Sequence, residues 1–408
     1  MANPAMSTPA ASSDPDATCD TRAVAAWLVD GARSASQSED VLTEMCVRLT
    51  ECGAPLWRVA VYVHTLHPQI VARRFLWRPG VVTDVAVASF EMAATDLFRQ
   101  SPITRIRVTG ETIRRRLADA DCPIDYPILS ELLEEKVTDY LAMPLNFTNG
   151  EIHAASFTTR QAGGFTEAQI AGLETIIPPL SRVAEVRALR RTAVNLLDAY
   201  VGHEAGERIL AGRIRRGDTE AIRAAIWLSD MRGFTKLADT IPPQELIERL
   251  NLFYDCLVPA IQAEGGEVLK FIGDGLLAIF RIADEAKIDD ICARALRAAR
   301  DARVRIEALP AQGDGETEAR LRFGLALHVG EVLYGNIGAG DRLDFTCIGP
   351  AVNMAARLEK VASRLQRTVV VSRAFAEHLP EEFVSLGAFE LAGFRNAETV
   401  FGLREDGA

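Results

Sequence analysis

The sequence predicts an α+β protein in which a helical segment joins two regions that mix helices and strands. Three observations support this prediction: alternating helical and strand-like patterns over residues 21–180, an apolar stripe after them, and a second alternation over residues 220–405. A chain of 408 residues is long enough for two or three domains with separate cores. Its composition, 48% hydrophobic and 25% charged, excludes a wholly disordered or fibrous chain.

The composition and the N-terminal segment narrow the class of protein further. Residues 1–20 are rich in Ala, Ser, Pro and Asp and lack an apolar segment, which indicates a disordered tail rather than a signal peptide. No stretch of about 20 residues is free of charge, so no membrane span is expected. The seven cysteines include no CxxC pair, which favours reduced thiols and a cytoplasmic location. The net charge of −11 argues against a nucleic-acid binder, although a bound cation could still admit an anionic substrate.

The region over residues 21–180 is expected to fold as helix, paired strands, helix, paired strands and helix. The expected helices cover 21–52, 128–135 and the segment from Thr166, and the expected strands cover 57–64, 69–77, 139–146 and 152–159. Asn149-Gly150 separates the last two strands and predicts a hairpin turn. The order resembles that of GAF-type sensory domains, so we interpret the region as a GAF-like sensor with an unknown small-molecule or protein input. His64 and His67 could suggest a haem or metal ligand, but lone histidines beside a strand are usually structural.

Residues 181–219 are interpreted as a helical linker. Apolar residues follow one another there at a spacing of three and four, at Val186, Leu189, Ala193, Leu196 and Tyr200. This stripe favours a parallel two-stranded coiled coil. An amphipathic helix packed on its own domain is the alternative, because two heptads are a short run.

The third region, over residues 220–405, contains two acidic residues at suggestive places. Asp230 follows a short apolar strand at 224–228 and precedes Gly233 and the start of a helix. A carboxylate beside the amides of a helix N-terminus suits a cation and a phosphate, although an Asp at such a place is more often a helix cap.

The second acidic residue, Asp274, lies in a predicted turn. A long helix from Pro242-Pro243 to Gly265-Gly266 precedes two apolar runs, 267–272 and 276–280, which flank Asp274-Gly275 and predict a hairpin. Asp-Gly turns are common without any function. If this hairpin lies beside the strand of Asp230, however, two carboxylates meet, which is costly unless cations share them. The pair therefore predicts a two-metal site for phosphoryl chemistry.

Further along, runs at 321–329 and 331–337 flank Gly330 and predict a second hairpin, before a short strand at 343–348. Gly349-Pro350 then opens a helix.

That helix carries Asn353 and Arg357, four residues apart and therefore on one face. An amide and a guanidinium side by side suit a ribose and a pentavalent phosphate. Alternatively, Asn353 caps the helix, and Arg357 pairs with Glu359 or faces solvent.

Together these segments resemble the catalytic domain of class III nucleotidyl cyclases, over roughly residues 220–405. The matching motifs, in chain order, are Leu228–Thr235, Leu269–Gly275, His328–Gly330, Gly335–Gly338 and Asp344–Glu359. The resemblance implies a mainly antiparallel sheet flanked by helices, and the conversion of ATP to 3′,5′-cyclic AMP and pyrophosphate. It also implies a homodimer with shared active sites, which the linker stripe would clamp.

The resemblance also implies residue roles. Two Mg²⁺ or Mn²⁺ ions would be held by Asp230, Met231 and Asp274. Catalytic groups would be Asn353, which orients the ribose, and Arg357, which stabilises charge at the phosphate. Substrate contacts would come from Lys270, Thr346, Arg342, Gly233, Phe234 and Thr235. Lys270 and Thr346 would read adenine, whereas guanylate cyclases place an acceptor such as Glu at the position of Lys270.

Some positions depart from the family pattern. Thr346 stands where many members carry Asp, Pro350 replaces a common acidic residue, and Ala392 stands where a phosphate-binding Lys is frequent. Arg395 could replace that contact. The alternatives are a guanylate cyclase and a nucleotide-binding regulatory module without catalysis. A diguanylate cyclase is disfavoured because Gly273-Asp274-Gly275-Leu276 is not its expected Gly-Gly-Asp-Glu-Phe turn.

Overall fold

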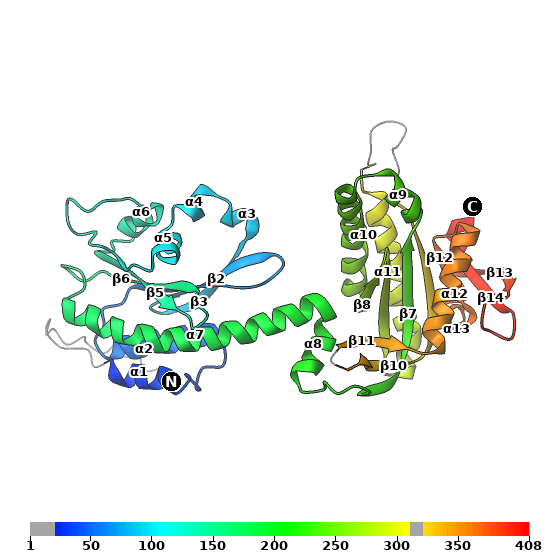
Figure 1. Ribbon diagram of the computed structural model, residues 1–408, viewed down its shortest axis with the longest axis horizontal. Coiled ribbons are helices and arrows are strands. Elements are labelled where there is room, and N and C mark those ends of the chain that lie inside the picture. The colour runs from blue at the N-terminus through cyan, green and yellow to red at the C-terminus, as the bar shows by residue number, and fades with distance from the viewer. Residues whose placement is uncertain (1–20, 311–320, 341, 408) are drawn as a thin grey trace, which may run out of the picture. The chain divides into compact units, whose positions relative to one another are not determined.

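A computed structural model describes residues 21–310, 321–340 and 342–407 (Figure 1). The tail expected over residues 1–20 lies outside this range. The chain forms two compact units, divided between Leu196 and Leu197. No helix among the described residues is both long and apolar enough to cross a membrane.

The N-terminal unit is built on one six-stranded sheet. Its strands are β1 (Arg58–His64), β2 (Ile70–Arg78), β3 (Val81–Ser89), β4 (Ile113–Arg115), β5 (Asp139–Asn146) and β6 (Ile152–Thr159). The strands lie in the order β3-β2-β1-β6-β5-β4, and all neighbours are antiparallel. The hairpin at Gly150 (φ +87°) is confirmed, with β5 and β6 over the expected residues. The sequence reading missed β3 and β4.

Helices cover both faces of this sheet (Figure 1). They are α1 (Arg22–Val29), α2 (Ser38–Glu51), α3 (Phe90–Ala93), α4 (Asp96–Arg99), α5 (Pro102–Thr109), α6 (Pro127–Glu134) and α7 (Glu167–Val201). One core joins α1, α2 and α7 to the sheet, and a second core joins α5 and α6 to it. The single helical stretch expected over 21–52 is wrong, because the chain turns at Gly31 (φ +88°) between α1 and α2.

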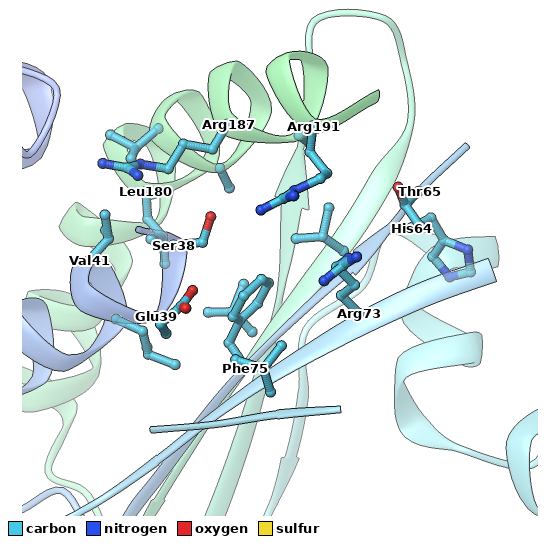
Figure 2. A pocket seen from close by; sticks show the side chains of 17 residues that line it. Ser38, Glu39, Val41, His64, Thr65, Arg73, Phe75, Leu180, Arg187 and Arg191 are labelled. Atoms are coloured by element: carbon cyan, nitrogen blue, oxygen red, sulfur yellow. The ribbon is translucent and has the colours of Figure 1, made fainter. Parts of the chain in front are cut away.

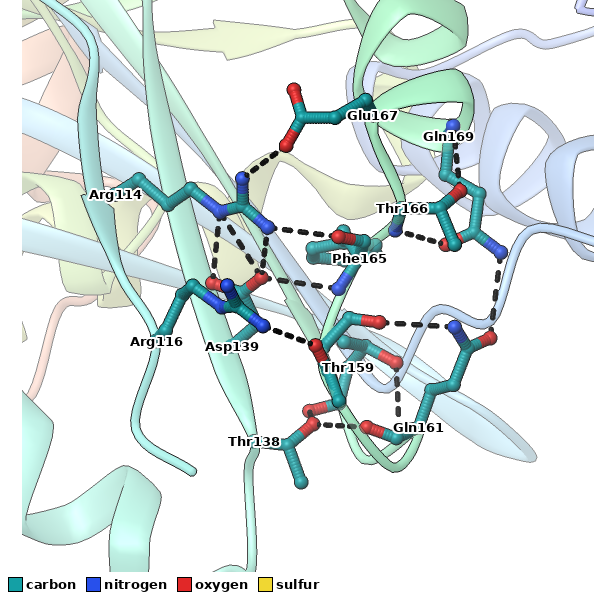
Figure 3. A network of polar contacts seen from close by, with 12 residues as sticks. Arg114, Arg116, Thr138, Asp139, Thr159, Gln161, Phe165, Thr166, Glu167 and Gln169 are labelled. Carbon is teal, nitrogen blue, oxygen red and sulfur yellow. Dashed lines mark hydrogen bonds and ion pairs between the residues drawn. The ribbon is translucent and has the colours of Figure 1, made fainter. Parts of the chain in front are cut away.

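A buried ion pair fixes the start of α7 (Figure 3). Asp139 is fully buried on β5 and accepts hydrogen bonds from Arg114 Nη2 (2.9 Å) and from the Phe165 amide (3.0 Å). Thr166 Oγ1 then caps the helix by accepting from the Gln169 amide (3.2 Å). From there α7 continues without a break to Val201, so the boundary expected at residue 181 falls inside a helix.

The C-terminal unit is built on a larger sheet. Its strands are β7 (Thr219–Met231), β8 (Glu267–Ile272), β9 (Gly275–Ile282), β10 (Phe323–Ala339), β11 (Arg342–Ile348), β12 (Val369–Ser372), β13 (Phe383–Phe389) and β14 (Glu398–Leu403). They lie in the order β13-β14-β12-β10-β7-β9-β8, and β11 pairs with β10. Only β10 and β12 are parallel, so the sheet among the described residues is mainly antiparallel, as expected.

Helices flank this sheet as well. They are α8 (His203–Leu210), α9 (Phe234–Thr240), α10 (Pro243–Ala263), α11 (Ile288–Glu307), α12 (Pro350–Leu365) and α13 (Arg373–Ala376), with short 3₁₀ turns at Glu285–Lys287 and Arg404–Gly407. Helices α10 and α11 bury Phe253, Leu257 and Leu296 in the main core. Helix α12 packs on the sheet through other cores, which contain Ala355 and Leu358.

The second hairpin expected at Gly330 is wrong. Strand β10 runs straight through Gly330 and pairs with β7 from Phe323 to Gly335. This glycine serves close packing instead of a turn, because a Cβ there would lie 2.6 Å from the Cβ of Ala351 on α12. The strand reverses only after Ala339, where it leads into β11.

Candidate active site

The two acidic residues singled out in the sequence meet at one end of the larger sheet. The Ile272–Gly275 register leaves Gly273 (φ +62°) and Asp274 as a two-residue turn between β8 and β9. Strand β9 pairs with β7 so that Gly275 lies opposite Asp230, and the Met231 amide donates to the Asp274 carbonyl (3.3 Å). The conditional prediction that this hairpin lies beside the strand of Asp230 is therefore confirmed.

The carboxyl groups of Asp230 and Asp274 are in hydrogen-bond contact. Burial raises the pKa of Asp230 to about 7, and the hydrogen bond and charge of Asp274 and the charge of Glu359 add to this, while Arg232 acts against it. The two groups therefore stay together without a cation only by retaining a proton, since two like charges this close repel.

Two glycines make room for this arrangement. A Cβ on Gly275 would lie 2.7 Å from the Ser229 carbonyl oxygen, so a larger residue would push β9 away from β7. On the other side of β7, Gly324 lies opposite Asp230, and a Cβ there would overlap the Arg232 guanidinium. Glycine is thus required by close approach to the backbone at position 275, whereas at position 324 it leaves the space that the Arg232 guanidinium fills.

Arg232, which the sequence reading passed over, ties the loop after β7 to α12. Its guanidinium forms an ion pair with Glu359 (3.0 Å), and both side chains are close to nine-tenths buried. It also donates to the Arg367 carbonyl (3.3 Å). Its position two residues after Asp230 was the one sign in the sequence that Arg232 belongs to the site. Its partner, Glu359, lies on a distant helix and could not be predicted from the sequence.

Tyr254 is a second residue that the sequence reading missed. Its hydroxyl, on α10, donates to the carbonyl oxygen of Gly273 (2.8 Å) and so holds the turn that carries Asp274. Burial, followed by the charges of Asp274 and Asp230, raises the pKa of Tyr254 to about 12. The phenol therefore remains a hydrogen-bond donor at neutral pH.

Lys270 and Thr346 lie on strands β8 and β11. Lys270 Nζ forms an ion pair with Asp344 Oδ2 (2.6 Å), a partner that the sequence reading did not name. Thr346 is buried on β11, two residues beyond Asp344, and its Oγ1 has no hydrogen-bond partner within the described part of the chain. A buried hydroxyl without a partner is costly, so this position suits a ligand that supplies one.

The helix of Asn353 and Arg357 is confirmed as α12, with Gly349 at its N-cap and Pro350 in its first turn. Asn353 is exposed and is not the cap. Arg357 does not pair with Glu359, which is taken by Arg232, but donates through Nε to the Ala392 carbonyl (3.0 Å).

The remaining predicted site residues surround the end of β7 and the start of β11. Gly233 (φ +74°) precedes α9, Phe234 packs against the core, and Thr235 is exposed. Met231 buries its side chain in the same core, which leaves its main-chain carbonyl as the possible metal ligand. Arg342 is exposed at the first residue of β11.

This donor set suits a divalent cation that a substrate also binds. Among the described residues, no three His, Cys, Asp or Glu side chains are grouped to hold a metal ion. Asp230 and Asp274 thus supply two carboxylates, to which Met231 could add a carbonyl. Mg²⁺ is commonly bound through one or two carboxylates, with water and substrate phosphates completing its shell.

Parts of the chain are similar to known proteins. Residues 219–404 match the model of the adenylate and guanylate cyclase catalytic domain. The chain is 31% identical over 176 residues to an adenylate cyclase of Anabaena cylindrica, covering 42% of this chain and 34% of that protein. It is 28% identical over 242 residues to adenylate cyclase 1 of Rhizobium meliloti (strain 1021), covering 56% and 35% respectively. The structure of a bacterial light-regulated adenylyl cyclase has 25% identity and a TM-score of 0.47, covering 57% of this chain and 66% of that one.

Residues 219–404 therefore form a class III adenylate/guanylate cyclase catalytic domain, as the sequence motifs indicated. The chain spans about a third of the length of the two curated relatives, at 34% and 35%.

Proposed function

We propose that the protein is an adenylate cyclase that converts ATP to 3′,5′-cyclic AMP and pyrophosphate. The observation that carries the proposal is the contact between Asp230 and Asp274 within a cyclase-family domain. In the reaction, the ribose 3′-oxygen bonds to the α-phosphorus, the bond from that phosphorus to pyrophosphate breaks, and the 3′-hydroxyl proton passes to solvent.

Asp230 and Asp274, with the carbonyl of Met231, would hold two Mg²⁺ or Mn²⁺ ions. Bound there, the ions would lower the pKa of the 3′-hydroxyl and neutralise the triphosphate. The amides of Gly233, Phe234 and Thr235 would donate to phosphate oxygens, and Arg342 would contact the triphosphate, as substrate contacts.

Adenine would be read by Lys270 and Thr346. An ammonium can donate to adenine N1, and the unpartnered Thr346 hydroxyl can accept from the exocyclic amine. Asp344 supports this role, because its carboxylate fixes the Lys270 side chain (2.6 Å). Guanine presents a donor at N1, so it would leave the ammonium facing another donor, which costs binding energy.

Asn353 and Arg357 would act on the ribose and the reacting phosphate. The Ala392 carbonyl occupies Nε of Arg357, which leaves both terminal nitrogens for phosphate oxygens. A guanidinium oriented in this way before the reaction stabilises charge that develops on the phosphate.

The test is to supply ATP and GTP separately to purified protein and to assay each cyclic product. We expect cyclic AMP from ATP and little cyclic GMP from GTP. A preference for GTP would contradict the reading of Lys270, and no product from either would favour a regulatory module without catalysis.

We further propose a homodimer with shared active sites, in which the metal carboxylates of one protomer face Arg357 of the other. The expected linker stripe is open to solvent, with Val186, Leu189 and Tyr200 exposed by 67%, 60% and 83%. Exposed apolar side chains also lie on the strands of the site, at Phe271, Ile272, Leu333, Leu343 and Ile348. Apolar surface of this kind favours association with another copy.

Complementation tests this arrangement. Asp230→Ala and Arg357→Ala should each abolish activity while leaving the dimer intact, as sedimentation would show. Mixing the two inactive proteins should restore partial activity, because one of the two sites in a mixed dimer keeps both groups. Unchanged turnover in Asp230→Ala would refute the assignment of the metal site, and no recovery on mixing would refute the shared sites.

The N-terminal unit would be a GAF-like sensor that regulates this cyclase in the cytoplasm. Its antiparallel sheet between two helical layers supports the proposal, and α7, which leads from that unit into the linker stripe, offers a route for the signal. A small rotation between protomers would open or close both sites. Deleting residues 1–180 should remove any response of turnover to the input while leaving basal cyclisation.

A further inference from the structure

A cavity of about 160 Å³ lies within the N-terminal unit, between the sheet and helices α2 and α7 (Figure 2). Its walls are largely apolar and include Val41, Leu42, Val63, Phe75 and Leu180. An apolar cavity of about 150 Å³ is large enough to bind benzene. The cyclase chemistry proposed above does not use this cavity.

Three arginines also line the cavity, and only Arg187 has hydrogen-bond acceptors among the described residues. Arg187, on α7, donates to the carbonyls of Ala35 (2.6 Å) and Ser36 (3.0 Å). Arg73 on β2 and Arg191 on α7 turn their guanidinium groups into the same space, opposite Ser38 (Figure 2).

Among the described residues, neither Arg73 nor Arg191 has a hydrogen-bond acceptor for its guanidinium. Nε of Arg73 is buried without a partner, whereas Arg191 is exposed and can donate to water until a ligand enters. Glu39 is the one carboxylate in the described lining, against three guanidinium groups. Burial, followed by the charge of Arg191, lowers the pKa of Arg73, yet a guanidinium does not lose its proton in proteins. The cavity therefore carries a positive charge that its own residues leave uncompensated.

We propose that this cavity binds a small organic carboxylate with an apolar body of about the size of a benzene ring. The carboxylate would accept hydrogen bonds from Arg73 and Arg191, because a planar guanidinium matches a carboxylate in geometry. The apolar body would rest on Phe75 and Val63. Such a ligand would join α7 to β2, and α7 is the helix that continues into the linker stripe. The site does not depend on the proposed cyclase activity.

Calorimetric titration of the full chain tests the ligand class. Benzoate is the probe, with benzyl alcohol as the neutral analogue, acetate as the carboxylate without a ring, and inorganic phosphate as the other anion. We expect saturable benzoate binding, and affinities at least about tenfold weaker for the other three, since each lacks the carboxylate or the ring. Absence of benzoate binding, or equal or tighter binding of any of the other three, would overturn the proposal.

Matched arginine variants locate the site. Arg191→Gln should weaken benzoate binding about tenfold or more, because it removes one of the two guanidinium groups that would bind the carboxylate. Arg73→Gln, on strand β2, should weaken benzoate binding to a similar extent. Arg190→Gln is the control, since Arg190 is exposed on the same helix, as Arg191 is, but does not line this cavity. Benzoate binding that neither Arg191→Gln nor Arg73→Gln weakens, or that Arg190→Gln weakens equally, would exclude this site.

Discussion

The end of β7 and the cavity beside α7 both bring like charges together, but they relieve the repulsion in different ways. For the acidic pair, Asp230 can keep its proton beside Asp274, because burial and the neighbouring carboxyl raise the pKa of Asp230 to about 7. Arg73 and Arg191 cannot release protons at any pH that a protein survives. The repulsion within a carboxylate pair can therefore be relieved by a proton or a cation, whereas the repulsion within a guanidinium pair can be relieved only by an anion.

A third arrangement in the N-terminal unit shows the opposite case. Asp139 and Arg114 are oppositely charged, and the Phe165 amide completes the set of hydrogen bonds (Figure 3). Here the protein satisfies its own charge, and nothing is left for a ligand. Whether a charge is internally satisfied thus separates the structural pair from the two candidate binding sites.

Removing one carboxylate gives the largest expected effect. Asp274→Asn should lower the proposed cyclase turnover by about a hundredfold or more, because the proposed metal site would lose a charged ligand. The same change should raise the thermal stability of the metal-free protein by about 1 kcal/mol, because it ends the repulsion with Asp230 in a partly exposed place. Turnover assays and thermal unfolding with a chelator measure the two effects.

The matched control for this change is Asp255→Asn, which alters an exposed carboxylate on α10. It should leave both quantities unchanged. A fall in the metal-free stability of Asp274→Asn would mean that the acidic pair is not strained, and full turnover would contradict the proposed role of Asp274 as a metal ligand.

Local sequence signals predicted much of this site. Asp274-Gly275 between two apolar runs fixed a hairpin, and Gly349-Pro350 marked the start of α12. These signals act within a few residues, where turn geometry and helix capping decide the structure. The same local reasoning failed at Gly330, because a strand interior and a turn both use glycine, and only the packing of α12 separates them.

Contacts between segments that are distant in the chain could not be predicted from the sequence. The pairing of Arg232 with Glu359, and the hydrogen bond from Tyr254 to the Gly273 carbonyl, join elements whose juxtaposition depends on the whole sheet. The cavity beside α7 was unreadable for the same reason, since Arg73 and Arg191 belong to a strand and a helix far apart in the chain. Charge that is uncompensated in space leaves no pattern along the sequence.

Breaking the satisfied pair should cost stability where the like-charge pairs do not. Asp139→Ala should destabilise the N-terminal unit by about 3 kcal/mol, because Arg114 and the Phe165 amide lose a buried partner. Scanning calorimetry should show one transition moved down and the transition of the C-terminal unit unchanged. The control is Asp84→Ala, which breaks the more exposed Arg74–Asp84 pair (2.8 Å) in the same sheet and should cost about 0.5 kcal/mol or less. Equal effects of both changes would contradict the role given to Asp139.

The smallest expected effect is a change in the pH dependence of stability, and it comes from Glu267, another carboxyl group with a raised pKa. Burial raises the pKa of Glu267 on β8 to about 7, although its oxygens accept hydrogen bonds from the Tyr334 hydroxyl (2.8 Å), which act against the rise. A carboxyl with a raised folded-state pKa gives stability that is complete below its unfolded pKa, which is 4.5. That stability is lost as the pH rises through 7.

Glu267→Gln should therefore remove part of the loss of stability of the C-terminal unit with rising pH, since the amide oxygen still accepts from Tyr334 and carries no charge. The difference in unfolding free energy between variant and native protein should grow in favour of the variant by about 1 kcal/mol from pH 5 to pH 8, after allowance for partial exposure. Taking this difference is essential, because burial lowers the pKa of His328 in the same unit to about 4, which adds stability as the pH rises toward 6.5. Glu331→Gln, at an exposed position on β10, should show no such trend. A constant difference for Glu267→Gln would mean that Glu267 stays ionised in the folded protein, and the contrast between groups that can discharge and guanidiniums that cannot would then rest on Asp230 alone.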